Sequence, residues 1–216
     1  MAKTVTAAEM KERERAANEA GLLYIQMMEN AGRAAYAELK RRVPALRRLL
    51  IVAGKGNNGG DGFVMARVAA KEGVQVRVLL AEGEPKTADA KTNLARLAET
   101  AAEVVRDTEQ AAFGADAVVD ALYGTGFHGE LRPDGAAACA LMGRERERGA
   151  FVLALDLPSG VCADGGEVAE GAVQADATVT FDCTKPLHFA KASKPLCGAL
   201  VCADIGIGKA LGEHET

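Results

Sequence analysis

Short continuous hydrophobic runs alternate along the chain with segments whose hydrophobic residues recur every three or four positions. Such runs are typical of strands buried on both faces of a parallel sheet, and the longer segments are typical of amphipathic helices that pack against it. The predicted strands cover residues 49–53, 74–80, 104–105, 117–122, 151–155, 177–181 and 200–203. The helices predicted between them cover residues 63–70, 87–99 and 136–148.

Two more helices are predicted ahead of the first strand. Thr6 and Glu9 fit a capping box, in which the two side chains satisfy the first free N–H groups of a helix. Gly21 is expected to end that helix, and a second one is expected over residues 25–43. Its hydrophobic stripe consists of Met27, Met28, Ala31, Ala34, Ala35 and Leu39.

The alternation of strands and helices predicts an α/β fold with a mostly parallel central sheet and right-handed crossovers. No internal repeat or low-complexity linker interrupts the pattern, so we expect one domain over residues 1–216. It would consist of N-terminal helices within 6–43 and a core over 49–208. The last residues, 212–216, are expected to form a frayed tail.

Composition adds several exclusions. The chain has 216 residues, of which 49% are hydrophobic, and a formal net charge of -4, so it can bury one sizeable core. Its 26 basic residues are outnumbered by 30 acidic ones and are mostly scattered, which argues against a nucleic-acid partner. The N-terminus does not resemble a signal peptide, and no hydrophobic stretch approaches the roughly 20 residues that span a bilayer. We therefore expect a cytoplasmic protein with no membrane partner.

The five cysteines are irregularly spaced and contain no Cys-x-x-Cys pair. We expect them to fill hydrophobic space, because free cysteine is commonly buried. They are Cys139, Cys162, Cys183, Cys197 and Cys202.

Candidate chemistry is concentrated in three motifs that follow predicted strands. They occupy residues 54–62, 120–126 and 156–160. In open parallel sheets, ligands bind beyond the carboxyl ends of the strands, where the strand order reverses. We therefore expect these motifs to meet at one ligand site.

The first motif has five glycines in nine residues, which predicts a turn that can adopt positive φ and approach a ligand closely. Its amides and the following helix N-terminus suit an anion or phosphate. It lacks the Gly-Lys-Ser/Thr of a Walker A loop, and its match to Gly-x-Gly-x-x-Gly is not clean enough to claim ordinary dinucleotide binding. Asn57, Asn58 and Asp61 add oxygen ligands beyond what a phosphate needs. The alternative is a tight turn in which Asn and Asp merely tolerate unusual dihedral angles.

The other two motifs carry carboxylates. Asp120 precedes a second flexible turn over residues 124–130 that could wrap a phosphate or ribose; the alternative is a plain loop that Asp120 caps. His128 within it fits a surface hydrogen-bonding residue better than a catalyst. In the third motif Pro158 stiffens a turn that holds Asp156 and Ser159, as acid/base and cation ligand respectively. A serine-hydrolase elbow, Gly-x-Ser-x-Gly, is absent from the third motif.

Together with residues 28–32 and 181–186, these motifs resemble the NAD(P)H-hydrate epimerase family, also called the YjeF N-terminal domain family, from about Thr6 to Gly208. The resemblance implies a Rossmann-like three-layer α/β/α sandwich. It also implies an isomerase that interconverts the R and S epimers of hydrated NADH or NADPH, which carry a hydroxyl at C6 of the nicotinamide ring. The expected partners are this small-molecule substrate, an ADP/ATP-dependent dehydratase that accepts one epimer, and a second copy of the chain in a homodimer.

The resemblance also implies roles for residues. Asn58, Asp120 and Ser159 match positions that hold one potassium ion per subunit, and hard oxygen donors suit an alkali cation. The positions that match nucleotide contacts are Asn57, Asn58, Gly59, Gly60, Asp61, Gly124, Thr125, Gly126, Phe127, His128, Gly129, Glu130 and Asp156.

For the reaction itself, a carboxyl group can protonate the leaving hydroxyl and later accept a proton from water. We expect Asp156 in this role and Asp120 second. Lys185 is a third candidate, although the sequence favours a surface or phosphate-contacting lysine. The chain has Leu187, His188 and Phe189 after Pro186, where the family pattern leads us to expect a glycine. The alternatives are a non-catalytic nucleotide-binding or interaction module and an ATP-dependent transferase; the missing Walker sequence weighs against the latter.

Overall fold

The computed structural model describes residues 3–213 and contains one seven-stranded sheet. The strand order is β3-β2-β1-β4-β5-β6-β7, and every pairing is parallel. The predicted α/β class is confirmed, with a wholly parallel sheet. The strands are β1 (Arg48–Ala53), β2 (Gln75–Leu80), β3 (Glu103–Val105), β4 (Ala117–Ala121), β5 (Phe151–Leu155), β6 (Ala177–Phe181) and β7 (Ala199–Ala203).

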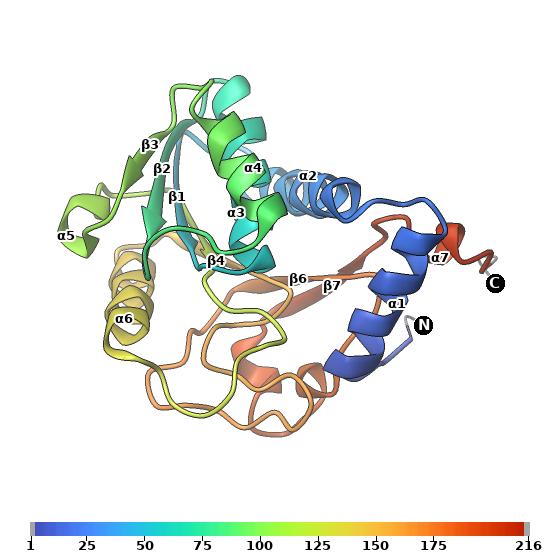
Figure 1. Cartoon of the computed structure of the whole chain (residues 1–216). Coiled ribbons are helices and arrows are strands. Elements are labelled where there is room, and N and C mark those ends of the chain that lie inside the picture. Colours follow the sequence, from blue (N-terminus) through green and yellow to red (C-terminus); the bar gives the residue numbers. More distant parts are fainter. Residues whose placement is uncertain (1–2, 214–216) are drawn as a thin grey trace.

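Helices cover both faces of the sheet and complete three layers (Figure 1). One hydrophobic core joins α2, α3 and α4 to one face, and a second core joins α5 and α6 to the other. The helices are α1 (Ala7–Glu19), α2 (Tyr24–Arg42), α3 (Asn57–Lys71), α4 (Ala88–Leu97), α5 (Thr108–Ala111), α6 (Pro133–Glu147) and α7 (Ile207–Ala210). The pattern did not predict α5 and α7, which have four residues each and therefore show no helical period. Between residues 3 and 213, no helix is long and apolar enough to cross a membrane.

The strand order reverses between β1 and β4. The chain runs outward from β1 through β2 to β3, and then returns to pair β4 with the other side of β1. Ala53 at the end of β1 is in register with Ala121 at the end of β4. The loops that leave these two ends diverge, which opens the crevice in which α/β proteins bind ligands.

Both ends of the described chain are tied to the region after β6. The predicted capping box of α1 is confirmed, because Thr6 accepts from the N–H of Glu9 and the Glu9 carboxylate accepts from the N–H of Thr6. Arg13 on α1 pairs with Asp182 at 2.9 Å and with Glu213 at 2.7 Å. Of the tail expected to fray, Glu213 is therefore held by an ion pair, and residues 214–216 lie outside the described part.

The cysteines are all free. Cys139, Cys183 and Cys197 are buried, and Cys162 and Cys202 are partly buried. The expectation that they fill space is confirmed for the three buried side chains.

The glycine-rich segment differs most from its prediction. Helix α3 begins at Asn57, within the motif, and not at Phe63 as the pattern predicts. None of the glycines between 54 and 62 adopts positive φ. The glycines are needed because α3 starts against other parts of the chain: a Cβ on Gly59 would lie 2.1 Å from the carbonyl oxygen of Gly54. Low intrinsic helix propensity is overridden here by close packing.

Gly60 and Gly62 face similar crowding. A Cβ on Gly60 would lie 2.5 Å from the sulfur of Met28 on α2, and one on Gly62 would lie 2.8 Å from the Cβ of Ala121 on β4. The first two turns of α3 therefore touch α2 and the sheet directly, which fixes where the side chains between these glycines point.

We expect Gly59→Ala to lower the free energy of unfolding by about 1–3 kcal/mol, because its methyl group would meet backbone that cannot move aside. The matched control is Gly143→Ala on α6, where a Cβ would meet nothing within 4 Å. That change should raise stability by roughly 0.5–1 kcal/mol through helix propensity alone. Urea unfolding of both variants tests this, and equal effects of the two substitutions would contradict the packing argument.

Candidate active site

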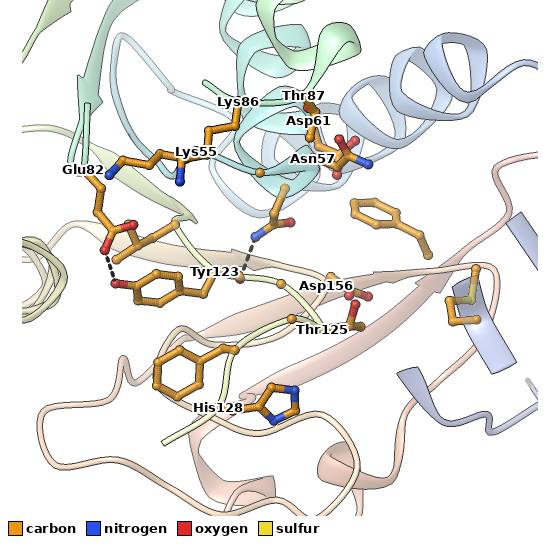
Figure 2. Close-up of a pocket in the computed structure, with 18 of the residues that line it drawn as sticks. Lys55, Asn57, Asp61, Glu82, Lys86, Thr87, Tyr123, Thr125, His128 and Asp156 are labelled. Carbon is orange, nitrogen blue, oxygen red and sulfur yellow. Dashed lines mark hydrogen bonds between the residues drawn. The ribbon is translucent and has the colours of Figure 1, made fainter. Parts of the chain in front are cut away.

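A cavity of about 610 Å³ lies at the carboxyl edge of the sheet, at the reversal point between β1 and β4. This volume lies in the range typical of small-molecule and cofactor sites. Its walls come from the start of α3, from the loops after β2, β4, β5 and β6, and from α1 (Figure 2). The three motifs therefore meet at one edge, as the sequence predicts.

Most residues expected to contact a nucleotide line this cavity. They are Asn57, Asn58, Asp61, Gly124, Thr125, Gly126, Phe127, His128, Glu130 and Asp156. Gly59, Gly60 and Gly129 are not part of its lining. Gly59 and Gly60 are buried where α3 packs on its neighbours, so they allow the close packing of the helix instead of contacting a ligand.

The three expected cation ligands are joined through the backbone of Tyr123. The amide nitrogen of Asn58 donates to the carbonyl oxygen of Tyr123 at 2.8 Å, and the N–H of Tyr123 donates to Ser159 Oγ at 3.0 Å. Ser159 Oγ donates in turn to the Asp120 carboxylate at 2.6 Å. One atom of this chain of contacts has no partner within the described residues: the Oδ1 of Asn58 is buried and accepts no hydrogen bond.

Asp120 lies within the sheet, behind the cavity wall. Its side chain is fully buried, and it does not line the cavity. Burial raises the pKa of Asp120 to about 6, although hydrogen bonds from Ser159 and the N–H of Leu122 oppose the shift. A nearby positive charge would stabilise the ionised form of this buried carboxyl group.

Asp156 faces the cavity and forms an ion pair with Lys185. The Lys185 Nζ lies 2.5 Å from Asp156 Oδ1, and the side chains are 1% and 13% exposed respectively. The expectation of a surface position for Lys185 is therefore wrong. Burial favours the neutral form of Asp156, but the Lys185 ammonium outweighs it, so the pKa of Asp156 is held below its usual value. Asp156 is ionised at neutral pH.

The end of β6 and the loop after it hold this pair in place. Thr180 donates to the Asp156 carboxylate at 2.9 Å. Where a glycine was expected, residues 186–188 form one turn of 3-10 helix, and His188 is buried. The N–H of Lys185 donates to His188 Nδ1 at 3.0 Å, so the neutral ring carries its proton on Nε2, which lies 3.0 Å from the carbonyl oxygen of Asp156. Burial lowers the pKa of His188, which keeps it neutral.

The backbone at Asp156 is strained. Its φ is 65°, and the N–H of Leu157 donates to the carbonyl of Leu155 at 2.8 Å, which closes a γ-turn. Asp182 repeats this geometry after β6, with a φ of 59°. Positive φ costs a non-glycine residue about 1–3 kcal/mol, and such positions cluster at functional sites. The turn ends β5 abruptly and directs the Asp156 side chain into the cavity.

Two more carboxyl groups share this end of the cavity, Asp61 on α3 and Glu14 on α1. Burial, followed by the charges of Asp156 and Glu14, raises the pKa of Asp61 well above its usual value. The pKa of Glu14 is raised as well, by burial and then by Asp156. Lys185 opposes both shifts but already pairs with Asp156. This end is therefore rich in carboxyl groups, and they cannot all ionise together easily.

The opposite end carries cationic side chains. Lys55 and Lys86 line the cavity and reach toward Glu82, away from Asp156 (Figure 2). Glu82 is occupied by Arg132 at 2.9 Å and by the Tyr123 hydroxyl at 2.7 Å. The described structure contains no ion pair to either lysine, so both ammonium groups are available to an anionic ligand.

Several lining residues were missed from the sequence. Glu82 and Lys86 follow β2, so the rule that placed the three motifs could have found them. Lys185 was a third candidate, but its pairing was missed: it follows β6, Asp156 follows the neighbouring β5, and the same rule would have paired the two. Glu14 has no such signal, because only the packing of α1 brings it to the site.

Comparison with known proteins agrees with this architecture. A family model described as YjeF-related protein N-terminus matches residues 24–187. The chain belongs to this family. A protein of Pirellula staleyi named NAD(P)H-hydrate epimerase is 40% identical over 207 residues, which cover 90% of this chain and 88% of that protein. Helix α1 and its Glu14 lie outside the segment matched by the YjeF-related model.

Other members of the YjeF-related family are longer. A Coxiella burnetii protein named bifunctional NAD(P)H-hydrate repair enzyme Nnr is 36% identical over 93% of this chain, but the match covers 41% of its own length. The chain thus spans about two fifths of such relatives. The crystal structure of yeast ynu0 superimposes with a TM-score of 0.77 over 94% of this chain and 88% of that one, at 20% identity, which confirms the fold.

We expect Lys185→Met to lower the free energy of unfolding by about 3–5 kcal/mol near neutral pH, because it leaves Asp156 buried without its cation. The lowered pKa of Asp156 means that the pair contributes stability above the ordinary carboxyl pKa and loses it as the pH falls through the lowered value. In the variant, burial without Lys185 raises the pKa of Asp156, so Asp156 takes up a proton and the deficit shrinks between pH 7 and pH 4.

Urea unfolding near pH 7 and near pH 4 measures this difference. Lys191→Met is the matched control, since Lys191 is exposed and should tolerate the change with little effect. A deficit that is equal at the two pH values would contradict the assignment of a charged pair.

Proposed function

We propose that this protein epimerises hydrated NADH or NADPH at C6 of the nicotinamide ring, as a repair step for the damaged cofactor. The observation that carries the proposal is the polarity of the cavity: carboxyl groups around an ionised Asp156 at one end, and two available lysines at the other. The relatives named as NAD(P)H-hydrate epimerase and repair enzymes support the same substrate.

The two ends suit the two parts of a dinucleotide. The phosphates are anionic, and Lys55 and Lys86 with the start of α3 offer them positive charge and free N–H groups. The damaged nicotinamide ring is neutral but becomes cationic when its hydroxyl leaves. Carboxylates fixed around that ring stabilise the developing positive charge, which is the usual source of the largest catalytic effect.

The reaction then needs few groups. The C6 hydroxyl leaves as water after protonation, the ring nitrogen supplies its lone pair to C6, and water adds from the other face. Asp156 is ionised, faces the cavity and is held by Lys185, so it suits acceptance of a proton from the incoming water. Because Asp120 does not reach the cavity, we assign it to the cation site and not to proton transfer.

A potassium ion fits the residues behind the cavity wall. Among the described residues, no donor reaches the buried Oδ1 of Asn58, and the Asp120 carboxylate and Ser159 hydroxyl belong to the same hydrogen-bonded chain. Amide, carboxylate and hydroxyl oxygens form the hard donor set that alkali cations prefer. A bound cation would supply positive charge beside the Tyr123 loop and hold Asp120 ionised.

The longer relatives suggest that the product is consumed by a dehydratase specific for one epimer, either on the same polypeptide or as a separate protein. Assembly as a homodimer and a cytoplasmic location remain predictions that accompany this function.

We expect the protein to make the R epimer of hydrated NADH consumable by an S-specific dehydratase faster than spontaneous epimerisation does. Asp156→Asn should lower kcat roughly 10²–10⁴-fold, the usual effect of losing an acid/base group. The measurement is the rate at which the R fraction disappears when this protein is added to a mixture of the two epimers.

Asp182→Asn is the matched control, because Asp182 has the same turn geometry but does not line the cavity. It should keep most of the rate. A wild-type protein that does not exceed the spontaneous rate, with or without potassium, contradicts the proposed function and leaves a non-catalytic binding module.

We expect potassium to raise Tm more near pH 7.5 than near pH 5. Because the pKa of Asp120 is raised to about 6, its contribution to stability is present when it is protonated and is lost as the pH rises through 6. A cation offsets that loss only where Asp120 is ionised. Tm is compared in potassium chloride and in an equal concentration of a large organic cation.

Asn58→Ala should abolish this potassium effect, whereas Asn57→Ala, the neighbouring change, should preserve it. A potassium effect of equal size at both pH values would contradict the involvement of Asp120.

A further inference from the structure

Asp61 stands out among the groups of the cavity because its carboxyl group has no partner in the described structure. It projects from α3 in the second turn of the helix, and no hydrogen bond or ion pair between residues 3 and 213 involves its side chain. Figure 2 shows it on the wall formed by α3, with Asp156 on the facing wall. Both carboxyl groups line the same cavity.

Stereochemistry favours two such groups. Epimerisation at C6 removes a hydroxyl from one face of the ring and returns one to the other face. A single carboxyl group on one wall reaches only one face. Asp156 can serve one face, and a second proton-transfer group on the facing wall could serve the other.

We propose that Asp61 is this second acid/base residue and acts on the face of the ring opposite to Asp156. This inference rests on the proposed function. Asp61 was expected from the family resemblance only to contact the nucleotide, so the role in proton transfer is an addition.

The electrostatics prepare the two carboxyl groups for opposite tasks. Lys185 keeps Asp156 ionised, whereas burial together with the charges of Asp156 and Glu14 raises the pKa of Asp61 and so favours its protonated form. Paired carboxyl groups whose environments separate their pKa values are typical of acid/base catalysis. The groups that face Asp61 are Glu14 on α1, Asp156 after β5 and Lys185 after β6.

The step balances without any other reactant. The Asp61 carboxyl gives its proton to the C6 hydroxyl, the C–O bond breaks with its electron pair on oxygen, and water leaves while the ring nitrogen forms a double bond to C6. A water on the other side attacks C6, and its proton goes to Asp156. The protein is then left with Asp61 ionised and Asp156 protonated, which is the state required for the opposite epimer.

A small side cavity provides space for the departing water. It has a volume of about 70 Å³ and is lined by Asp61, Glu14 and Asn57 together with hydrophobic residues of α2. A water molecule needs roughly 10–15 Å³ of such space and two to four polar partners, and both conditions are met here. The side cavity opens at the carboxyl group that would release the water.

The test replaces Asp61 by its amide in the full chain. Asp61→Asn should lower kcat roughly 10²–10⁴-fold with a much smaller change in KM, since the amide keeps the shape but cannot give a proton. The pH profile of kcat/KM should lose its alkaline limb, which reports the protonated acid. Asp61→Glu should restore that limb and part of the rate.

Glu14→Gln supplies a second readout. Removing its like charge should lower the pKa of Asp61 and move the alkaline limb of the profile to lower pH, whereas a merely structural change would leave the limb in place. In the resting wild-type protein, NMR titration of side-chain-labelled aspartates should show Asp61 titrating above the ordinary carboxyl range.

The outcomes separate the two proposals. Suppose that the wild type epimerises the substrate, but Asp61→Asn keeps kcat within about threefold or changes only KM. Asp61 is then not the second acid, and the proposed function stands. If Asp61→Asn does not fold, the NMR titration decides, and an ordinary pKa for Asp61 overturns the inference. A wild type without epimerase activity overturns both proposals.

Discussion

The contact between the first turns of α3 and the sheet is the constraint on which the site depends. Gly59 lies directly against the carbonyl of Gly54, and Gly60 and Gly62 let the helix touch α2 and β4 without intervening side chains. This closeness leaves a narrow set of directions for the residues between the glycines. Asn58 is directed toward the Tyr123 loop, and Asp61 toward the cavity. A looser helix would leave neither side chain with a fixed position.

The side chains of the cavity place carboxyl groups at one end and lysines at the other, which the packing of α3 alone does not explain. One positive side chain, Lys185, is enclosed with a cluster of carboxyl groups, and it selects Asp156 as the one that remains ionised. Lys55 and Lys86 lie at the far end, near Glu82. The site thus separates the charge that suits phosphates from the charge that suits a ring becoming cationic, within a single cavity. Lysines beside the ring would oppose its developing positive charge, and carboxylates beside the phosphates would repel them.

Much of this could be predicted from the sequence, and the limits have physical reasons. Alternating hydrophobic runs predicted all seven strands, because a parallel sheet buries both faces of a strand. The glycines of α3 were interpreted as a flexible turn, because the local sequence does not show which distant segments pack against them. Those segments leave no room for a Cβ. Lys185 was expected at the surface because lysine is almost never fully buried unless it is paired. Its partner, Asp156, is near only because β5 and β6 are adjacent, which is a property of the sheet and not of either segment.

The ion pairs of Arg13 bear on how a minimal domain can be defined. Residues 24–187, the segment that matches the family model, omit both α1 and β7. Without β7, strand β6 becomes an edge, and all five of its residues are otherwise buried. An apolar edge strand of this kind pairs readily with other chains. Without α1, Met10 and Glu14 leave the cavity wall. The unit that encloses the site is therefore larger than the unit that the family model delimits, and both of its extra pieces contact Asp182 after β6, α1 through Arg13 and β7 through Ala203.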